Sequence, residues 1–317
     1  MGPVISRDEV QAAASRVGAL VRRTPVLATE LDGVGPVLFK LEQLQHAGSF
    51  KARGMLNRVR AAAERGELGR PGVVTASGGN AGLAMSYAAA RESVPAMVFV
   101  PETSPQVKVD RLRKLGATVR QVGDRYSVAY EAAIAEAQDS GAVFCHAYDQ
   151  PEMCAGNGTL GLELLEQTSG AVDTVLVAVG GGGLMAGIAT AVDGHAKVVA
   201  VEPSMCPTLA NALVAGEPVD APVSGVAADA LGATRVGEIA WAVATRCGVS
   251  SVLVDDDAII RARQLLWDEW RIVVEHGAAV GVAALLSGAY RPASGERIAV
   301  ILCGGNTSPA DLTPSAD

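Results

Sequence analysis

The residue with the clearest chemical potential is a lysine in an unusual place. Lys51 lies in HAGSFKARG (46–54), at what the pattern predicts to be the first turn of a helix. A cation is disfavoured at the positive N-terminal end of a helix dipole. Unless Lys51 is an ordinary solvated side chain, its pKa should therefore be lowered, which frees the amine to form an imine or to act as a base.

Four consecutive glycines form the second chemical feature, in AVGGGGLMAG (178–187), between the most apolar predicted strand and a helix. Backbone N–H groups at a helix start bind phosphate, and four glycines without a ligand would cost backbone entropy for no packing gain. The spacing Gly181-x-Gly183-x-x-Ala186, with Glu202 ending the next strand, also fits a dinucleotide fingerprint. A nicotinamide-dependent oxidoreductase is therefore an alternative.

Two further loops follow predicted strands, TASGGNAG (75–82) and VILCGGN (300–306). In the first, Ser77, Asn80 and the helix start can bind an anion, and a plain turn capped by Asn80 is an equal alternative. In the second, a small buried cysteine before a turn is by itself the simpler explanation of Cys303. Both loops lie where parallel sheets bind ligands, at the carboxyl ends of strands.

One cofactor accounts for all of these features together. Pyridoxal 5'-phosphate needs a phosphate site, a lysine, a group facing its ring nitrogen and a carboxylate site for an amino-acid substrate. A dinucleotide would use only the tetraglycine loop and would leave Lys51 unexplained. The residues therefore favour a pyridoxal-phosphate enzyme that acts on a small-molecule amino acid.

The elements that must position these residues alternate between short apolar runs and alanine-rich helical stretches. This alternation predicts an α/β fold with mostly parallel sheets covered by helices on both faces. The first helix begins with a capping box at Ser6 and Glu9, and other helices are predicted at 81–93 and 256–270. The predicted strands are 37–42, 72–77, 96–100, 117–122, 142–147, 174–179, 197–202, 250–255 and 297–303.

The composition excludes several classes of partner. The 317 residues are 49% hydrophobic and carry a net charge of −8, so the chain is not expected to bind nucleic acid or a membrane surface. Its five cysteines form no C-x-x-C pair, which disfavours a disulfide framework or zinc site and predicts a cytoplasmic protein. No apolar run is long enough for a membrane span or signal segment, and the tail 308–317 is expected to fray.

The quoted motifs resemble a known family over nearly the whole chain. GSFKARG, SGGNAGLAMSYAAAR, VGGGGLMAG and CGGN are similar to pyridoxal-phosphate enzymes of the tryptophan-synthase-β type (fold type II). Within these, the chain most resembles the L-serine/L-threonine dehydratase and serine racemase group. The resemblance implies a cofactor cleft between two domains. Residues 1–42 and 145–317 would form the large cofactor-binding domain, and residues 43–144 the small mobile substrate-binding domain.

The resemblance also implies a role for each matched residue. Lys51 would be the catalytic residue and would bind the cofactor covalently, with Cys303 at the ring nitrogen. The other cofactor-binding residues would be Phe50, Asn80, Gly180, Gly181, Gly182, Gly183, Leu184, Gly225 and Ala227. The substrate carboxylate would be bound by Ser77, Gly78, Asn80 and Ala81. No metal site is expected, because the pattern after AVEPS (200–204) lacks the acid that metal-binding relatives have.

The sequence therefore predicts an ammonia-lyase (dehydratase) that converts L-serine or L-threonine to a 2-oxo acid and ammonia, working as a homodimer. A racemase on the same scaffold is an alternative, but racemases of this family have a serine as second proton donor where this chain has Gly78. A pyridoxal-phosphate carrier without turnover is a further alternative. Two positions depart from the family pattern, Ala81 in place of a frequent histidine and His276 in place of proline.

Overall fold

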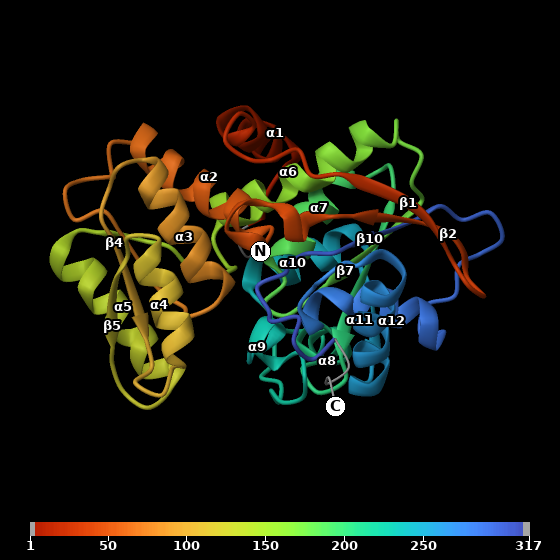
Figure 1. The fold of residues 1–317 in the computed structure, drawn as a ribbon. Helices are drawn as coiled ribbons and strands as arrows, with labels where there is room; N and C mark the ends of the chain where they lie inside the picture. Colours follow the sequence, from red (N-terminus) through yellow and green to blue (C-terminus); the bar gives the residue numbers. More distant parts are fainter. Residues whose placement is uncertain (1–3, 313–317) are drawn as a thin grey trace.

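The computed structural model describes residues 4–312, and two sheets organise this part of the chain (Figure 1). The larger sheet has the strand order β1-β2-β10-β7-β8-β9. Its neighbouring strands are parallel except for the antiparallel pair β1–β2. Its strands are β1 (Val26–Leu31), β2 (Gly35–Lys40), β7 (Thr174–Ala178), β8 (Lys197–Pro203), β9 (Ser250–Val254) and β10 (Ile298–Ile301).

The smaller sheet is wholly parallel and has the strand order β5-β4-β3-β6. It lies beside the larger sheet in the view of Figure 1. Its strands are β3 (Val73–Ala76), β4 (Ala96–Val100), β5 (Thr118–Gln121) and β6 (Val143–Phe144).

Helices pack against both sheets, and within residues 4–312 none is long and apolar enough to cross a bilayer. In the smaller unit they are α2 (Lys51–Glu64), α3 (Asn80–Arg91), α4 (Gln106–Lys114) and α5 (Tyr126–Ser140). The others are α1 (Arg7–Val17), α6 (Pro151–Gln167), α7 (Gly183–Val192), α8 (Thr208–Ala215), α9 (Ala228–Leu231), α10 (Glu238–Cys247), α11 (Asp256–Trp270) and α12 (His276–Ser287). Short 3-10 turns span Glu42–Leu44 and His46–Gly48.

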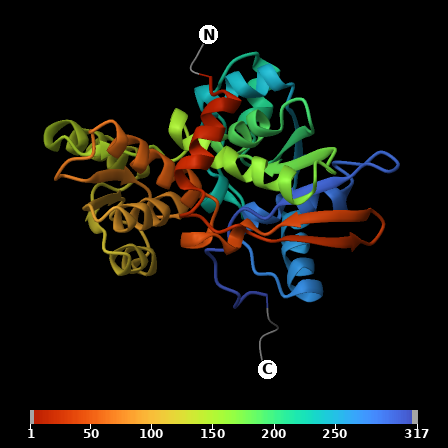
Figure 2. The same ribbon diagram turned by 90° about the horizontal axis from the view of Figure 1, so that it is seen from above.

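Alternating side chains show that both faces of the smaller sheet are covered. Val73 and Val98 belong to a core shared with α2, α3 and α4, whereas Val74 and Phe99 pack with α5. In the larger sheet, α7 contacts β7 and β8, and α12 contacts β7 to β10 from the other side (Figure 2). This arrangement confirms the predicted α/β fold with helices on both faces of mostly parallel sheets.

The predicted strands are all present, with two differences from the sequence analysis. The strand predicted at 142–147 is reduced to Val143–Phe144. Strand β1 was not predicted, because it is a partly buried edge strand without a continuous apolar run. The capping box of Ser6 and Glu9 is confirmed at the start of α1.

Of two expectations about chain organisation, the structure agrees with the first and corrects part of the second. Strands β3 to β6 lie between residues 73 and 144, which supports the proposed small domain of 43–144 beside 1–42 and 145–317. The prediction that 308–317 frays is wrong for 308–312. There Asp311 pairs with the buried Arg263 at 2.6 Å and Leu312 is buried. Residues 313–317 lie outside the described part.

The backbones of helices α6 and α7 are in direct contact, and this contact fixes the position of α7. A Cβ atom at Gly187 would lie 2.5 Å from the backbone nitrogen of Gly158, and one at Gly158 would lie 2.7 Å from the Gly187 carbonyl oxygen. Any larger residue at either position would push the helices apart. The tetraglycine loop is therefore attached to a helix that has little freedom to shift.

Candidate active site

Lys51 begins α2, as the sequence predicted. Its Nζ donates a hydrogen bond to the Ala147 carbonyl at 2.9 Å and lies 4.9 Å from the ring centroid of Phe50. Burial lowers the pKa of Lys51 to about 8, against the opposing influence of the nearby Cys303 and Glu275 groups. The direction is the one expected from the helix dipole, but the main cause is desolvation.

A buried ion network holds the first turn of α2 in place. Arg53 donates from Nε to Glu42 at 2.6 Å, and its Nη1 lies 3.1 Å from Glu163 of α6. Lys40 pairs with the same Glu163 carboxylate. Removing one partner from a buried pair of this kind typically costs about 3–5 kcal/mol, because the other charge is left unpaired. The position of Lys51 is thus fixed by charges two residues away along the helix.

The tetraglycine loop, residues 180–183, has no room for side chains. A Cβ atom at Gly180 would lie 2.7 Å from the Leu231 carbonyl oxygen, and one at Gly181 or Gly183 would overlap Tyr148. Gly182 has a φ of 85°, which L side chains rarely adopt. Each position therefore requires glycine.

The backbone of this loop provides donors for an anion. The N–H groups of residues 180–184 donate no hydrogen bond to any group within residues 4–312. They lie at the N-terminus of α7, where the helix dipole also favours negative charge. The loop therefore fits the phosphate of pyridoxal phosphate, as the sequence predicted from its glycines.

Cys303 lies directly beside the lysine segment. The Phe50 N–H donates to the Cys303 carbonyl at 3.0 Å, and Ser49 forms an isolated β-bridge with Gly304. Burial raises the pKa of the Cys303 thiol to about 12, so this group is neutral at physiological pH. A neutral thiol cannot stabilise a protonated pyridine nitrogen as a carboxylate would.

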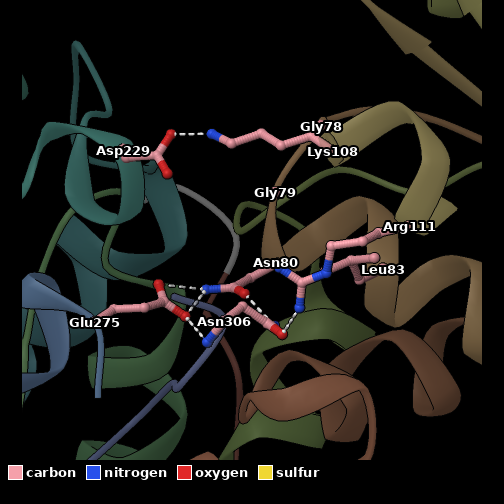
Figure 3. A pocket seen from close by; sticks show the side chains of 9 residues that line it. All are labelled: Gly78, Gly79, Asn80, Leu83, Lys108, Arg111, Asp229, Glu275 and Asn306. Atoms are coloured by element: carbon pink, nitrogen blue, oxygen red, sulfur yellow. Dashed lines mark hydrogen bonds and ion pairs between the residues drawn. The ribbon is translucent and has the colours of Figure 1, made fainter. Parts of the chain in front are cut away.

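The loops at 77–80 and 303–306 are joined by a hydrogen-bond network (Figure 3). Asn80 donates from Nδ2 to both Glu275 oxygens, at 3.0 and 2.9 Å, and accepts from Asn306 Nδ2 at 2.7 Å. The Asn306 backbone N–H donates to Glu275 at 2.9 Å, and burial raises the pKa of Glu275. Neither Glu275 nor Asn306 was predicted as a site residue, although the sequence offered Asn306 as the last residue of CGGN.

A pocket opens beside this network, between the two sheets (Figure 3). Two basic side chains of α4 face it, Lys108, which pairs with Asp229 of α9, and Arg111, which donates to Asn306 at 2.5 Å. The sequence analysis missed both, since nothing local distinguishes them from other cations of that helix. The residues that line the pocket are Gly78, Gly79, Asn80, Leu83, Lys108, Arg111, Asp229, Glu275 and Asn306.

The predicted substrate residues divide into two groups. Gly78 and Asn80 are pocket-lining residues, as is the neighbouring Gly79. Ser77 accepts a hydrogen bond from the Gly79 N–H at 3.3 Å and shapes the loop, and Ala81 is buried in the core of the smaller unit. The start of α3 thus presents its backbone to the pocket.

The predicted positions 225 and 227 do not line the pocket, and only Ala227 is linked to the tetraglycine loop, through Leu231. Gly225 has a φ of 81° and packs against the Asp256 carboxylate. Ala227 is buried and accepts from the N–H of Leu231, whose carbonyl adjoins Gly180. Ala227 and Leu231 connect α9 to the tetraglycine loop.

Glu202, the acid weighed as a ribose or metal ligand, is buried and bound by the protein. Its oxygens accept from the N–H groups of Leu209 and Ala210, both at 2.8 Å, and from the Ser251 hydroxyl. Within residues 4–312, no group of three or more His, Cys, Asp or Glu side chains could hold a metal ion. We keep the absence of a metal requirement as a proposal.

Comparison with known proteins adds to this geometry. Residues 17–304 match the family described as "Pyridoxal-phosphate dependent enzyme". The L-threonine ammonia-lyase of Geobacter sulfurreducens is 36% identical over 304 residues, which cover 94% of this chain and 74% of that protein. The serine racemase of Arabidopsis thaliana is 34% identical over 316 residues, covering 96% and 94%.

The structural comparison gives the same fold. The structure of maize serine racemase superposes with a TM-score of 0.90 at 30% identity, covering 98% of this chain and 96% of that one. Ammonia-lyases and racemases thus match at similar identity, so the likeness identifies the scaffold and not one reaction on it.

Proposed function

Because the chain belongs to the pyridoxal-phosphate-dependent enzymes, with pyridoxal 5'-phosphate as cofactor, we propose that it is an ammonia-lyase. The proposed reaction converts L-serine to pyruvate, or L-threonine to 2-oxobutanoate, with release of ammonia. The observation that supports elimination over racemisation is Gly78, which lines the pocket and has no side chain to donate a proton. The family assignment argues against the alternative of a dinucleotide-dependent oxidoreductase.

Four groups of this chain would hold the cofactor. The N–H groups of residues 180–184, which have no partner within residues 4–312, would bind its phosphate. Cys303 would meet the ring nitrogen, and Phe50, whose ring lies beside Lys51 Nζ, would pack against the cofactor ring. Asn80 would bind the ring hydroxyl through its amide oxygen, which here accepts from Asn306 while Nδ2 donates to Glu275. When bound, the cofactor supplies an electron-withdrawing ring conjugated to the substrate nitrogen, which acidifies the Cα–H bond.

Lys51 is the proposed base. Its lowered pKa of about 8 leaves a substantial fraction of the amine neutral near physiological pH. The Ala147 carbonyl, which accepts from Nζ at 2.9 Å, orients that amine. Lys51 then removes the Cα proton, and the β-hydroxyl leaves as water. The released enamine takes up water and decays to the 2-oxo acid and ammonia, so the atoms balance.

The loop at 77–80 is the proposed site of the substrate carboxylate. It joins β3 to α3, and the free N–H groups of a helix start favour an anion. Ser77 and Ala81 shape this turn from behind, while Gly78 and Asn80 line the pocket. Binding the carboxylate here would place the substrate between the small sheet and Lys51.

A serine racemase is the second candidate, and the 34% identity to the Arabidopsis enzyme favours it. Holoenzyme is incubated with L-serine, and pyruvate and D-serine are followed together by chiral chromatography; L-threonine is tested in parallel for 2-oxobutanoate. We expect 2-oxo acid with little D-serine. D-serine forming as fast as pyruvate would replace the lyase by the racemase, and no product at all would favour a carrier.

We further propose that the enzyme is a cytoplasmic homodimer. The family resemblance supports the dimer, and the five free cysteines fit a reducing compartment. Size-exclusion chromatography with light scattering tests the dimer directly. A monomer at micromolar concentration would contradict it.

A further inference from the structure

The proposed reaction leaves two basic side chains of the pocket without a role. Lys108 and Arg111 are three residues apart on α4, so they project from the same face of that helix. Figure 3 shows both reaching across the pocket, Lys108 toward Asp229 and Arg111 toward Asn306. Dehydration of serine or threonine, which have neutral side chains, needs neither cation.

The pocket is lined by two basic and two acidic side chains, and only one ion pair joins them. Lys108 forms an ion pair with Asp229, and Glu275 accepts hydrogen bonds from Asn80 and Asn306. Arg111 donates to the neutral amide oxygen of Asn306 at 2.5 Å and forms no ion pair within residues 4–312. Its guanidinium is therefore the pocket cation that can accept an anionic partner without breaking an existing pair.

The lining of the pocket also disfavours an apolar substituent. Of its nine lining residues, only Leu83 has an apolar side chain. A bulky aliphatic or aromatic group would lose water contacts of the polar wall and gain few apolar contacts in return. A small anionic group would instead meet a guanidinium, which binds carboxylates through two parallel hydrogen bonds.

We propose that Arg111 binds a second carboxylate, attached to the β-carbon of the substrate. The preferred substrate class is then β-hydroxy amino acids with an acidic side chain, and the simplest is 3-hydroxyaspartate. This inference rests on the proposed lyase function and on the α-carboxylate binding at the 77–80 loop. The β-carboxylate takes the place of the Asn306 oxygen as the acceptor of Arg111.

The reaction balances for this substrate as it does for serine. The Cα–H and Cβ–O bonds break, and the proton and hydroxyl leave as water. The released enamine takes up one water and gives oxaloacetate and ammonia. No oxidant or reductant is needed.

The first test compares kcat/KM for 3-hydroxyaspartate and L-serine in wild-type holoenzyme and in Arg111→Gln. Wild type should prefer 3-hydroxyaspartate at least about tenfold, and Arg111→Gln should lower that preference about 10- to 100-fold, as for a lost charge-assisted hydrogen bond. Arg111→Lys should retain part of it. Arg113→Gln is the matched control, since Arg113 lies on the same helix, pairs with Asp110 and does not line the pocket.

A binding experiment separates this inference from the proposed function. Succinate and butyrate have the same carbon count but two carboxylates and one, and neither has an amine to react. By calorimetry on holoenzyme, succinate should bind at least about tenfold tighter than butyrate in wild type and lose that advantage in Arg111→Gln.

The outcomes distinguish the two hypotheses. If no amino acid yields a 2-oxo acid, the lyase fails, and the succinate preference still decides whether Arg111 binds a second carboxylate. If L-serine is converted but Arg111→Gln reduces both substrates equally, Arg111 has only a structural role and the substrate-class inference is overturned.

Discussion

The two loops that we propose to bind anions, residues 180–183 and 77–80, differ in how tightly their glycines are packed. In the tetraglycine loop, a Cβ atom at Gly180 or Gly183 would collide with backbone atoms of neighbouring segments. In the 77–80 loop, a Cβ atom at Gly78 would meet only Val100 at 3.5 Å, an ordinary contact, and one at Gly79 would meet nothing within 4 Å. Packing therefore requires glycine in the first loop and does not require it in the second.

This difference suggests that the tetraglycine loop is the part of the proposed site that cannot change, whereas the 77–80 loop can accept other residues. A phosphate that is always the same suits a loop that is fixed by its surroundings and attached to the closely packed helix α7. A substrate loop with free space can accept a side chain, so the residue at position 78 can change the reaction while the fold stays the same. The predictions below test this contrast, beginning with Lys51.

Replacing Lys51 by alanine should have the largest effect, because we propose that the amine is both the cofactor attachment point and the base. We expect 2-oxo acid release to fall about 10³-fold or more. Borohydride reduction followed by peptide mapping should find the cofactor on Lys51 in the wild type. Lys114→Ala, an exposed lysine of α4, is the control and should retain activity. A label on another lysine would contradict the site.

The second prediction sets one glycine from each loop against the other. Gly183→Ala forces a methyl group against the Tyr148 carbonyl, and overpacking of this kind costs about 1–3 kcal/mol. The dissociation constant of the cofactor should therefore rise about 10- to 100-fold. Gly79→Ala, where the space is open, should leave it within about twofold. Spectroscopic titration of cofactor into apoenzyme measures both, and equal losses would remove the contrast.

The pH dependence of cofactor loading tests Lys51, the proposed attachment point. Attachment needs the neutral amine, and the neutral fraction rises as pH increases through the Lys51 pKa of about 8. The loading rate should increase about tenfold between pH 7 and pH 9 and then level off, as expected for a single group of that pKa. A stopped-flow absorbance series measures it. A rate that keeps rising toward pH 10 would indicate an unperturbed lysine.

Gly78→Ser should change the product and not the fold. Position 78 has room for the hydroxymethyl group, and its backbone is outside the left-handed region. If the missing proton donor is what limits racemisation, the D-serine fraction should rise several-fold. A well-positioned acid contributes about 10²-fold or more to a rate, and a newly introduced serine hydroxyl is not optimally positioned, so we expect a smaller gain. Gly79→Ser, with equal space one residue away, is the control. An unchanged product ratio would show that position 78 does not set the reaction.

Removal of divalent metal should have the smallest effect, because it touches neither loop. The Glu202 oxygens are already occupied by hydrogen bonds from Leu209, Ala210 and Ser251. EDTA should change the rate of 2-oxo acid release by less than about twofold, because a carboxylate whose oxygens are already occupied is not expected to bind a hard cation. A large loss that magnesium restores would identify a metal site elsewhere.

The features found from the sequence are those whose chemistry is local. Four successive glycines before a helix predict a phosphate loop wherever the helix lies, and Lys51 at a helix start predicts a lowered pKa. The structure confirms the lowered pKa but assigns it mainly to desolvation, which depends on the groups packed around the side chain. Apolar strand runs were likewise found locally, whereas the partly buried edge strand β1 lacked a continuous apolar run.

The sequence by itself therefore determined the α/β fold and predicted the roles of Lys51 and of the tetraglycine loop, since neighbouring residues are sufficient for each of these inferences. Tertiary structure decided the network around the pocket. Asn80 and Glu275 are 195 residues apart, as are Arg111 and Asn306, and no periodicity or spacing links such pairs. They meet because segments from both sheets and their helices line the same pocket. That Arg111 forms no ion pair within residues 4–312 depends on which side chains meet at the pocket, and α4 by itself does not reveal it.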